Sequence, residues 1–469
     1  MKTLIKNGTI ITSEGEYRAD ILVDGERIAA IGTGFTADQV VDASGRYIFA
    51  GGVDQHTHFN FQFGTAVVRG FETSAAALVG GTTTVVDFAN QEIGRSIADS
   101  IQDYRTQKID GVTSCDYALH GVVFTPDDPT IAEIPKLPEI GVSTLKLFMA
   151  YKGHPYHCDD EALFRALCAS RDAGVTIMVH AENADVIDVL QQDLLTQGRT
   201  EPYSHALSRP PVVEHEATQR AILLAEAANA PLFVVHVTCK EAMEAVRSAY
   251  QRGLDIYGET CTHYLVLDRE LLAKPNFEGA KYVCSPPLRT EEHRNVLWEA
   301  IDKNWLVCVS SDHCGFDYGQ QKHLGVGDFT KIPNGTPSLE NRLAILWTYG
   351  VEQGRISRSR MVDLFSTTPA KINGIFPQKG MLSVGSDADI VIFDPTYRGV
   401  ITAQGSLQGV DYSPFEGMEQ IGRAETVLLR GNIMVHNGNL VGETGKGKFI
   451  PGKPFGMSYQ RRTANQKEE

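Results

Sequence analysis

The sequence lacks the features that mark membrane, secreted and nucleic-acid-binding proteins. Its apolar runs are broken by charged residues or glycine well before the ~18 residues that a membrane span needs. The eight cysteines form no Cys-x-x-Cys pair, and the N-terminus lacks the long apolar stretch of a signal peptide. These absences favour a cytoplasmic protein whose cysteines are reduced and buried.

Positive charge is also scarce. The chain has 43 lysine and arginine residues against 58 aspartate and glutamate residues, a formal net charge of −15. Such a surface repels phosphate backbones and anionic lipids, so nucleic acid and membrane are poor candidates for partners. Hydrophobic residues make up 42% of the chain and charged residues 22%, which excludes global disorder. The 469 residues leave room for one large core and a smaller second unit.

Two kinds of pattern divide the chain. Residues 1–50 alternate apolar and polar side chains around Asn-Gly and Asp-Gly turns, and the same pattern returns in residues 384–469. It predicts a small β-sandwich domain formed by both chain ends. Residues 460–469 are polar, and we expect this tail to be mobile.

Residues 51–383 alternate short β-branched runs with amphipathic stretches. Eight apolar runs can be counted, and the helical stretches between them end in Gly or Asn, as helix C-termini commonly do. Near-continuous apolar strands that alternate with helices indicate a parallel sheet, and eight such units favour a (β/α)₈ TIM-like barrel. A doubly wound sheet gives the same local pattern and stays an alternative.

Nitrogen and oxygen ligands gather at the ends of the predicted strands, where the active site of a barrel lies. The first run ends in His56 and His58, the fifth at His180, the sixth at His236 and the eighth at Asp312. The first two are two residues apart on a strand, so both imidazoles point the same way, as a shared metal ion requires. Each residue alone has an ordinary explanation, such as a core histidine or a helix cap. Their common position at strand ends predicts a metal site.

Lys146 stands out because it lies within the apolar stretch TLKLFMAY. A buried ammonium without a partner is costly, so such a lysine tends to lose its charge or to find an anion. The alternative is an alternating strand from which Lys146 reaches out to solvent. A neutral amine can react with carbon dioxide to give a carbamate, which is an anion able to bridge two metal ions.

Several motifs together resemble the cyclic-amide hydrolases of the amidohydrolase superfamily, above all the dihydropyrimidinase and D-hydantoinase (phenylhydantoinase) group. They are VDQHTHF, STLKLFMAYKG, VHAEN, VVHVT, YVCSPPLR, VSSDHC and IPNGTPSLENR. The resemblance covers almost the whole chain. It implies a hydrolase that opens dihydropyrimidines or 5-monosubstituted hydantoins to N-carbamoyl amino acids, and it implies a homotetramer.

The resemblance also implies a binuclear zinc centre, although the same ligand types suit Mn²⁺ or Co²⁺. His56, His58 and Asp312 would hold one ion, and His180 and His236 the other. Lys146, carboxylated on its side-chain nitrogen, would bridge the two ions. Hydroxide would attack the ring carbonyl, and Asp312 would take its proton and deliver it to the leaving nitrogen.

Three further residues match positions that bind the substrate in similar enzymes. Tyr151 would donate a hydrogen bond to the developing oxyanion, and main-chain groups of Ser285 and Asn334 would recognise the imide edge of the ring. Without the resemblance, all three would count as packing or turn residues. Three neighbours of the predicted strand ends are expected to support or pack against the ligands: His263, His313 and Cys314.

Related functions remain open. Allantoinases share much of the ligand set, and non-catalytic scaffold proteins of the same family have lost ligands that this chain retains. Dihydroorotases carry an arginine two residues after the histidine pair, where this chain has Asn60, which argues against an anionic substrate. Residues 59–65 lack the proline of many dihydropyrimidinases. Their three phenylalanines either line the pocket for the exocyclic group or are buried through alternation.

Overall fold

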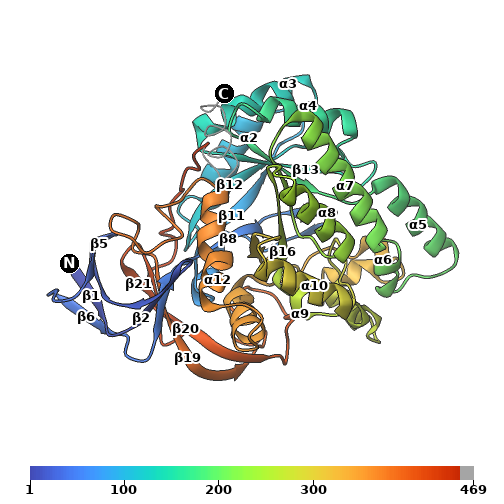
Figure 1. The fold of residues 1–469 in the computed structure, drawn as a ribbon. Helices are drawn as coiled ribbons and strands as arrows, with labels where there is room; N and C mark the ends of the chain where they lie inside the picture. The colour runs from blue at the N-terminus through green and yellow to red at the C-terminus, as the bar shows by residue number, and fades with distance from the viewer. Residues whose placement is uncertain (455–469) are drawn as a thin grey trace.

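The computed structural model describes residues 1–454, so the expectation for residues 460–469 lies outside it. Figure 1 shows two units side by side. One is a ring of strands surrounded by helices. In the other, strands from the blue N-terminal end of the chain lie beside orange and red strands from its C-terminal end.

The eight predicted runs form a closed parallel barrel. The strand order is β17-β16-β15-β14-β13-β12-β11-β8-β18, and every neighbouring pair is parallel. β17 and β18 are two parts of the eighth strand, which pair with β16 and with β8 and so close the ring. The closed ring excludes the doubly wound alternative. The strands are Gly52–His58 (β8), Thr82–Asn90 (β11), Asp116–Val122 (β12), Thr144–Phe148 (β13), Thr176–His180 (β14), Leu232–Val234 (β15), Ile256–Cys261 (β16), Cys308–Ser310 (β17) and His313–Cys314 (β18).

Helices cover the outside of the barrel and begin and end at residues suited to caps. α4 (Asp160–Ser170) follows Asp159, whose carboxylate accepts a hydrogen bond from the Ala162 N–H. α7 (Pro211–Ala228) ends at Asn229, which has a left-handed backbone with φ 48°. The other α-helices are Ala75–Val79 (α1), Ile97–Tyr104 (α2), Asp128–Glu133 (α3), Ala184–Thr196 (α5), Tyr203–Leu207 (α6), Lys240–Gln251 (α8), Thr262–Val266 (α9), Glu291–Asp302 (α10), Arg342–Ile345 (α11), Arg358–Val362 (α12) and Thr368–Ile372 (α13).

Both chain ends build the second unit. Its two sheets have the orders β5-β4-β1-β6 and β22-β21-β20-β19-β7-β2-β3. Side chains from both sheets, among them Ile5, Ile48 and Leu428, share an apolar core of their own. The strands are Lys2–Lys6 (β1), Thr9–Thr12 (β2), Gly15–Arg18 (β3), Asp20–Asp24 (β4), Arg27–Gly32 (β5), Gln39–Asp42 (β6), Tyr47–Ala50 (β7), Ile390–Val400 (β19), Glu419–Leu429 (β20), Asn432–His436 (β21) and Asn439–Leu440 (β22).

A buried cluster of ion pairs connects the two units at the N-terminal end of the barrel. Lys379 Nζ lies 2.5 Å from Asp116 at the start of β12, and 3.0 and 2.7 Å from Asp387 and Asp389 just before β19. Arg430, next to β20, also pairs with Asp116. Removal of one partner from such a cluster leaves charge buried without compensation, so the cluster holds the two units in one arrangement.

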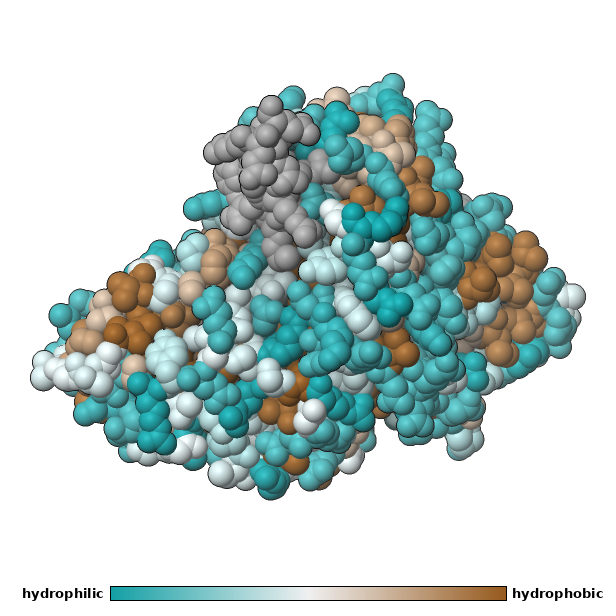
Figure 2. All heavy atoms as spheres, in the orientation of Figure 1, coloured by the Kyte–Doolittle hydropathy of each residue, from teal (hydrophilic) through white to brown (hydrophobic). Residues whose placement is uncertain are grey.

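The surface agrees with the composition. Figure 2 shows a largely hydrophilic face with hydrophobic side chains gathered at its right edge, over α5, where Val186 and Val189 are exposed. Among residues 1–454, no helix is both long and apolar enough to cross a membrane. All eight cysteines are free, and seven of them are buried.

Candidate active site

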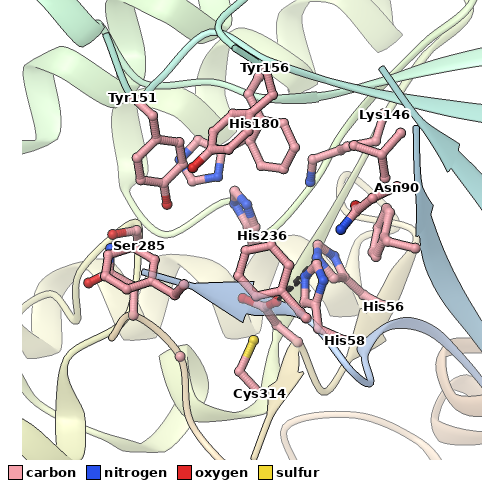
Figure 3. Close-up of a pocket in the computed structure, with 18 of the residues that line it drawn as sticks. His56, His58, Asn90, Lys146, Tyr151, Tyr156, His180, His236, Ser285 and Cys314 are labelled. Carbon is pink, nitrogen blue, oxygen red and sulfur yellow. Dashed lines mark ion pairs between the residues drawn. The ribbon is translucent and has the colours of Figure 1, made fainter. Parts of the chain in front are cut away.

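One pocket at the C-terminal end of the barrel strands collects all of the predicted metal ligands and substrate-binding residues. Figure 3 shows their side chains converging from several strands and loops. Since these residues are spread over 279 positions of the chain, from 56 to 334, only the barrel can bring them together. The selected residues that line it are His56, His58, Lys146, Tyr151, His180, His236, Ser285, Asp312 and Asn334.

Three ligand atoms meet on the side of β8. The Nε2 atoms of His56 and His58 lie 3.2 and 3.3 Å from the same Oδ1 atom of Asp312, as the dashed lines of Figure 3 mark. The three side chains form a group whose ligand atoms all lie within 4.8 Å of one another. Two imidazoles and one carboxylate in this arrangement match the donor set of a divalent transition metal.

Two buried glutamates decide which imidazole nitrogen faces the pocket. Glu259 Oε1 lies 2.6 Å from Nδ1 of His56, and Glu182 Oε2 lies 2.7 Å from Nε2 of His180. The Nε2 atom of His56 is buried, and although Asp312 Oδ1 lies 3.2 Å away, the described residues give it no hydrogen bond, as expected of a ligand atom. A carboxylate on the far nitrogen fixes the tautomer and orientation of a metal-binding histidine. The residues present therefore fit a metal ion.

The sequence analysis missed both glutamates. A signal was present, because Glu259 lies inside the apolar run LDIYGETC and Glu182 lies two residues after His180, at the end of another apolar run. A buried carboxylate in such a position needs a partner. The partner could not be named without the fold, since Glu259 is 203 residues away from His56 in the chain.

Burial favours the neutral, metal-binding form of three histidines that line the pocket, because it lowers the pKa of each. Desolvation lowers the pKa of His58 to about 4 against the opposing hydrogen bond to Asp312, and it lowers the pKa of His180 as well. The pKa of His236 is held well below its usual value, chiefly by burial. Burial opposes ionisation of Asp312, but His56 and His58 outweigh it and hold the pKa of that carboxyl well below its usual value.

Lys146 is buried, with 1% of its surface exposed, so the alternative in which it reaches out to solvent is wrong. Its Nζ atom lies 5.1 Å from the ring centre of Phe88 and 5.2 Å from that of Phe148. Desolvation lowers the pKa of Lys146 to about 8, although the charges of Asp312 and Glu259 oppose the shift. A substantial fraction of the amine is therefore neutral near physiological pH.

Three pocket residues have a left-handed backbone, which non-glycine residues rarely adopt. The φ angles are +64° at Tyr151, +40° at His236 and +47° at Asp312. Each residue follows a barrel strand within three positions. Such strain persists only where the surrounding structure enforces it, and it concentrates at functional sites.

The hydroxyl of Tyr151 points into the cavity beside Ser285 (Figure 3). Burial raises the pKa of Tyr151 to about 12, with Arg209 opposing this shift together with hydrogen bonds to Ser285 and Asn334. The guanidinium of Arg209 lies 5.6 Å from the centre of the tyrosine ring. The phenol is therefore a hydrogen-bond donor at neutral pH.

The three phenylalanines after β8 divide between the two expected roles. Phe59 is buried, and its ring stacks on Phe71 at 4.4 Å between ring centres. Phe61 and Phe63 line the pocket. Phe63 lies in a small hairpin formed by Gln62–Phe63 (β9) and Ala66–Val67 (β10). Simple alternation would have placed all three rings on one face, but the chain bends between Phe59 and Phe61, where Asn60 has a φ of +55°.

The remaining residues of interest lie beside the pocket or behind it. Asn60 is not among the lining residues, and its side chain interacts with Tyr104. Cys314 does line the pocket. His263 and His313 are fully buried, and His263 joins Cys261 and Asp312 in a second group of potential ligand atoms. These neighbours pack around Asp312, as expected.

Comparison with known proteins decides the family, because the profile of the Amidohydrolase family matches residues 47–434. The chain belongs to the amidohydrolase family. This amidohydrolase is 46% identical to the D-hydantoinase of Geobacillus stearothermophilus, over 97% of this chain and 98% of that protein. It is 45% identical to the D-hydantoinase of Ralstonia pickettii, over 97% of this chain and 100% of that protein.

Solved structures agree with this assignment. The crystal structure of dihydropyrimidinase from Brevibacillus agri NCHU1002 matches with a TM-score of 0.95 and 45% identity, covering 97% of this chain and 99% of that one. L-Hydantoinase from Arthrobacter aurescens matches with a TM-score of 0.87 and 31% identity, covering 96% and 99%. The predicted resemblance to the dihydropyrimidinase and D-hydantoinase group is confirmed, and with it the prediction of a cyclic amide hydrolase. Membership of the amidohydrolases also implies a binuclear metal centre.

Proposed function

We propose that this amidohydrolase opens the ring amide of D-5-monosubstituted hydantoins and of dihydropyrimidines, and that it releases N-carbamoyl amino acids. The observation that carries the proposal is the convergence of the nine selected residues in one pocket. The relatives named D-hydantoinase and dihydropyrimidinase support the substrate class.

In this proposal two divalent cations, zinc in the first place, complete the site. His56, His58 and Asp312 would hold one ion, His180 and His236 would hold the other, and Lys146 in its carboxylated form would serve as a shared ligand. The bound ions supply Lewis acidity, which lowers the pKa of water toward neutrality and polarises a carbonyl. The lowered pKa of Lys146 supports carboxylation, because only a neutral amine can add to carbon dioxide.

The side chains of the pocket provide the remaining chemistry. Asp312 is the one carboxylate among the described residues that line the pocket, so it takes the proton of the attacking water and delivers it to the leaving ring nitrogen. Tyr151 donates its hydroxyl hydrogen to the oxygen on which negative charge develops. Main-chain groups of Ser285 and Asn334 hold the imide edge of the ring.

The pocket wall supports a neutral substrate with an apolar substituent. Aromatic side chains dominate the wall, and no arginine of the described residues lines it, so a substrate carboxylate lacks the usual bidentate partner. The aromatic residues are Phe61, Phe63, Phe88, Phe124, Phe148, Tyr151 and Tyr156. A phenyl or alkyl group at ring position 5 would pack against them.

We further propose a cytoplasmic homotetramer. The free cysteines support a reducing compartment, and the exposed valines of α5 support contact with another subunit. Light scattering coupled to size-exclusion chromatography measures the mass, and a monomer would contradict the assembly.

The test of function is ring opening by the zinc-loaded protein. The panel contains dihydrouracil, D- and L-5-phenylhydantoin, allantoin and dihydroorotate, and chelation provides the control. We expect turnover of dihydrouracil and D-5-phenylhydantoin that chelation abolishes. Turnover of allantoin alone would assign the chain to the allantoinases. Absence of both turnover and bound metal would identify a scaffold protein.

A further inference from the structure

One fully buried lysine, Lys322, does not line the substrate pocket. Lys322 begins the short helix η6 (Lys322–Gly325), and none of its surface is exposed. It belongs to the segment that follows the eighth barrel strand. Burial lowers the pKa of Lys322 to about 7, because desolvation penalises the ammonium form. A methionine of similar length would avoid this penalty, so the retained lysine calls for an explanation.

The ammonium group uses all of its N–H bonds on main-chain carbonyls. Its Nζ atom donates to Val283 O at 2.9 Å, to Pro333 O at 2.6 Å and to Gly335 O at 2.7 Å. Three donors thus meet three acceptors, which is the full capacity of an ammonium and one more than a neutral amine offers. Hydrogen bonds from a charged donor are also stronger than those between neutral groups.

These three carbonyls belong to the two segments that carry Ser285 and Asn334. Pro333 and Gly335 flank Asn334 on both sides, and Val283 lies two residues before Ser285. The Gly335 N–H also donates to Val283 O at 3.0 Å, so the segments touch directly at one point. Lys322, which is not among the residues that line the pocket, therefore joins both segments.

Packing against the barrel also restricts the main chain of residues 333–335. Gly335 has a φ of +127°, and a Cβ atom placed there would lie 2.3 Å from the Cβ of Cys314 on the eighth strand. The 333–335 segment is thus pressed between the barrel and the ammonium of Lys322. A change in the length or charge of this side chain would alter the spacing between Ser285 and Asn334.

We propose that Lys322 is a positioning residue that sets the distance between the two main-chain segments which hold the imide edge of the substrate ring. The proposal rests on the proposed function, since it assumes the substrate contacts of Ser285 and Asn334. It predicts a defect in ring binding that is independent of the metal centre and of the exocyclic group.

The decisive variant is Lys322→Met, which keeps the length of the side chain and removes its donors. We expect KM for dihydrouracil and for D-5-phenylhydantoin to rise by the same factor, roughly 10- to 100-fold, because displacement of a binding group by about 1 Å is enough for such a loss. We expect kcat to change less than about threefold, the pattern of a binding contact made equally in ground and transition states. Zinc content, measured by mass spectrometry, stays at the wild-type value.

Arg360→Met is the matched control. Arg360 also ties main-chain carbonyls of separate segments, donating to Ile301 O at 2.6 Å and to Leu306 O at 3.0 Å, but it lies at the opposite end of the barrel. It should lower the melting temperature and leave both KM values within about twofold of wild type. If Lys322→Met behaves in the same way, Lys322 is only structural and the proposal is wrong.

A second variant covers the case in which Lys322→Met fails to fold. Lys322→Gln keeps two N–H donors on a shorter side chain and should give a partial rise in KM, again equal for the two substrates. An unchanged KM in Lys322→Gln, or a rise for one substrate only, would overturn the proposal. If wild-type protein opens neither ring, the proposed function itself has failed, and the role of Lys322 falls with it.

Discussion

At the N-terminal end of the barrel Lys379 is surrounded by three carboxylates, whereas at the C-terminal end Lys146 faces two aromatic rings. Both lysines are 1% exposed. At the N-terminal end, carboxylates fully balance the charge of Lys379, so this lysine stabilises the contact between the barrel and the β-sandwich. At the other end, nearby negative charge offsets the desolvation of Lys146 only in part, so the pKa of Lys146 is lowered and its amine is reactive. The neighbours of each lysine, and not its burial, determine what it does.

The largest effect expected from this comparison is the loss of catalysis in Lys146→Met. Without the bridging carbamate, ring-opening activity should fall by roughly 10³-fold or more, because catalysis depends on the ions that the bridge holds. Metal content should fall with it. After chelation the free energy of unfolding should stay within about 1 kcal/mol of wild type or rise, since an uncompensated charge has left the core. Full activity with two bound ions would refute the bridging role.

The reciprocal variant, Lys379→Met, should lower the free energy of unfolding and leave catalysis unchanged. It leaves Asp116, Asp387 and Asp389 buried without their shared cation, so unfolding in denaturant should show a loss of about 3–5 kcal/mol. Metal content and KM of the folded fraction should remain at wild-type values. A selective loss of zinc from Lys379→Met would contradict this contrast between the two ends of the barrel, because it would show that the N-terminal cluster also supports the active site.

A smaller effect is expected from the aromatic wall at the C-terminal end. Phe63→Ala should lower the preference for D-5-phenylhydantoin over dihydrouracil, in the ratio of kcat/KM, by about 10-fold or more, because the phenyl group loses an apolar partner. Phe59→Ala is the control. Its ring packs in the core on Phe71, so it should cost about 3–5 kcal/mol of stability and leave the preference unchanged.

The smallest effect is a pH dependence of metal rebinding. Carbamate formation needs the neutral amine, and the pKa of Lys146 is about 8, so the neutral fraction grows as pH rises through that value. At a constant pressure of carbon dioxide, the rate at which chelated protein regains activity with zinc should rise about fivefold from pH 7 to pH 8 and level off above pH 9. A rate that does not depend on carbon dioxide would contradict carboxylation.

The local sequence was enough to predict the barrel strands and the candidate ligands at their ends, whereas Tyr151, Ser285 and Asn334 were selected only through the resemblance to known enzymes. A strand that ends in His56-x-His58 carries its own signal, because neighbours in sequence determine both the strand and the direction of the side chains. The partners of Lys322 and of His56 could not be predicted in this way. The first are carbonyls on distant loops, and the second is Glu259, whose role depends on strand order around the ring. Alternation alone also left open which face of residues 59–63 meets the pocket.

The interrupted eighth strand has a consequence for the order in which the protein assembles. β18 joins β8 through only two residue pairs, His313 with Thr57 and Cys314 with His58. The proposed ligands His58 and Asp312 lie on opposite sides of this seam, with Nε2 and Oδ1 3.3 Å apart, so a metal ion held by both would also link the two strands that close the ring. We therefore expect metal binding to stabilise the closed ring. Amide protons on both sides of the seam should exchange with solvent more slowly once the metal is bound.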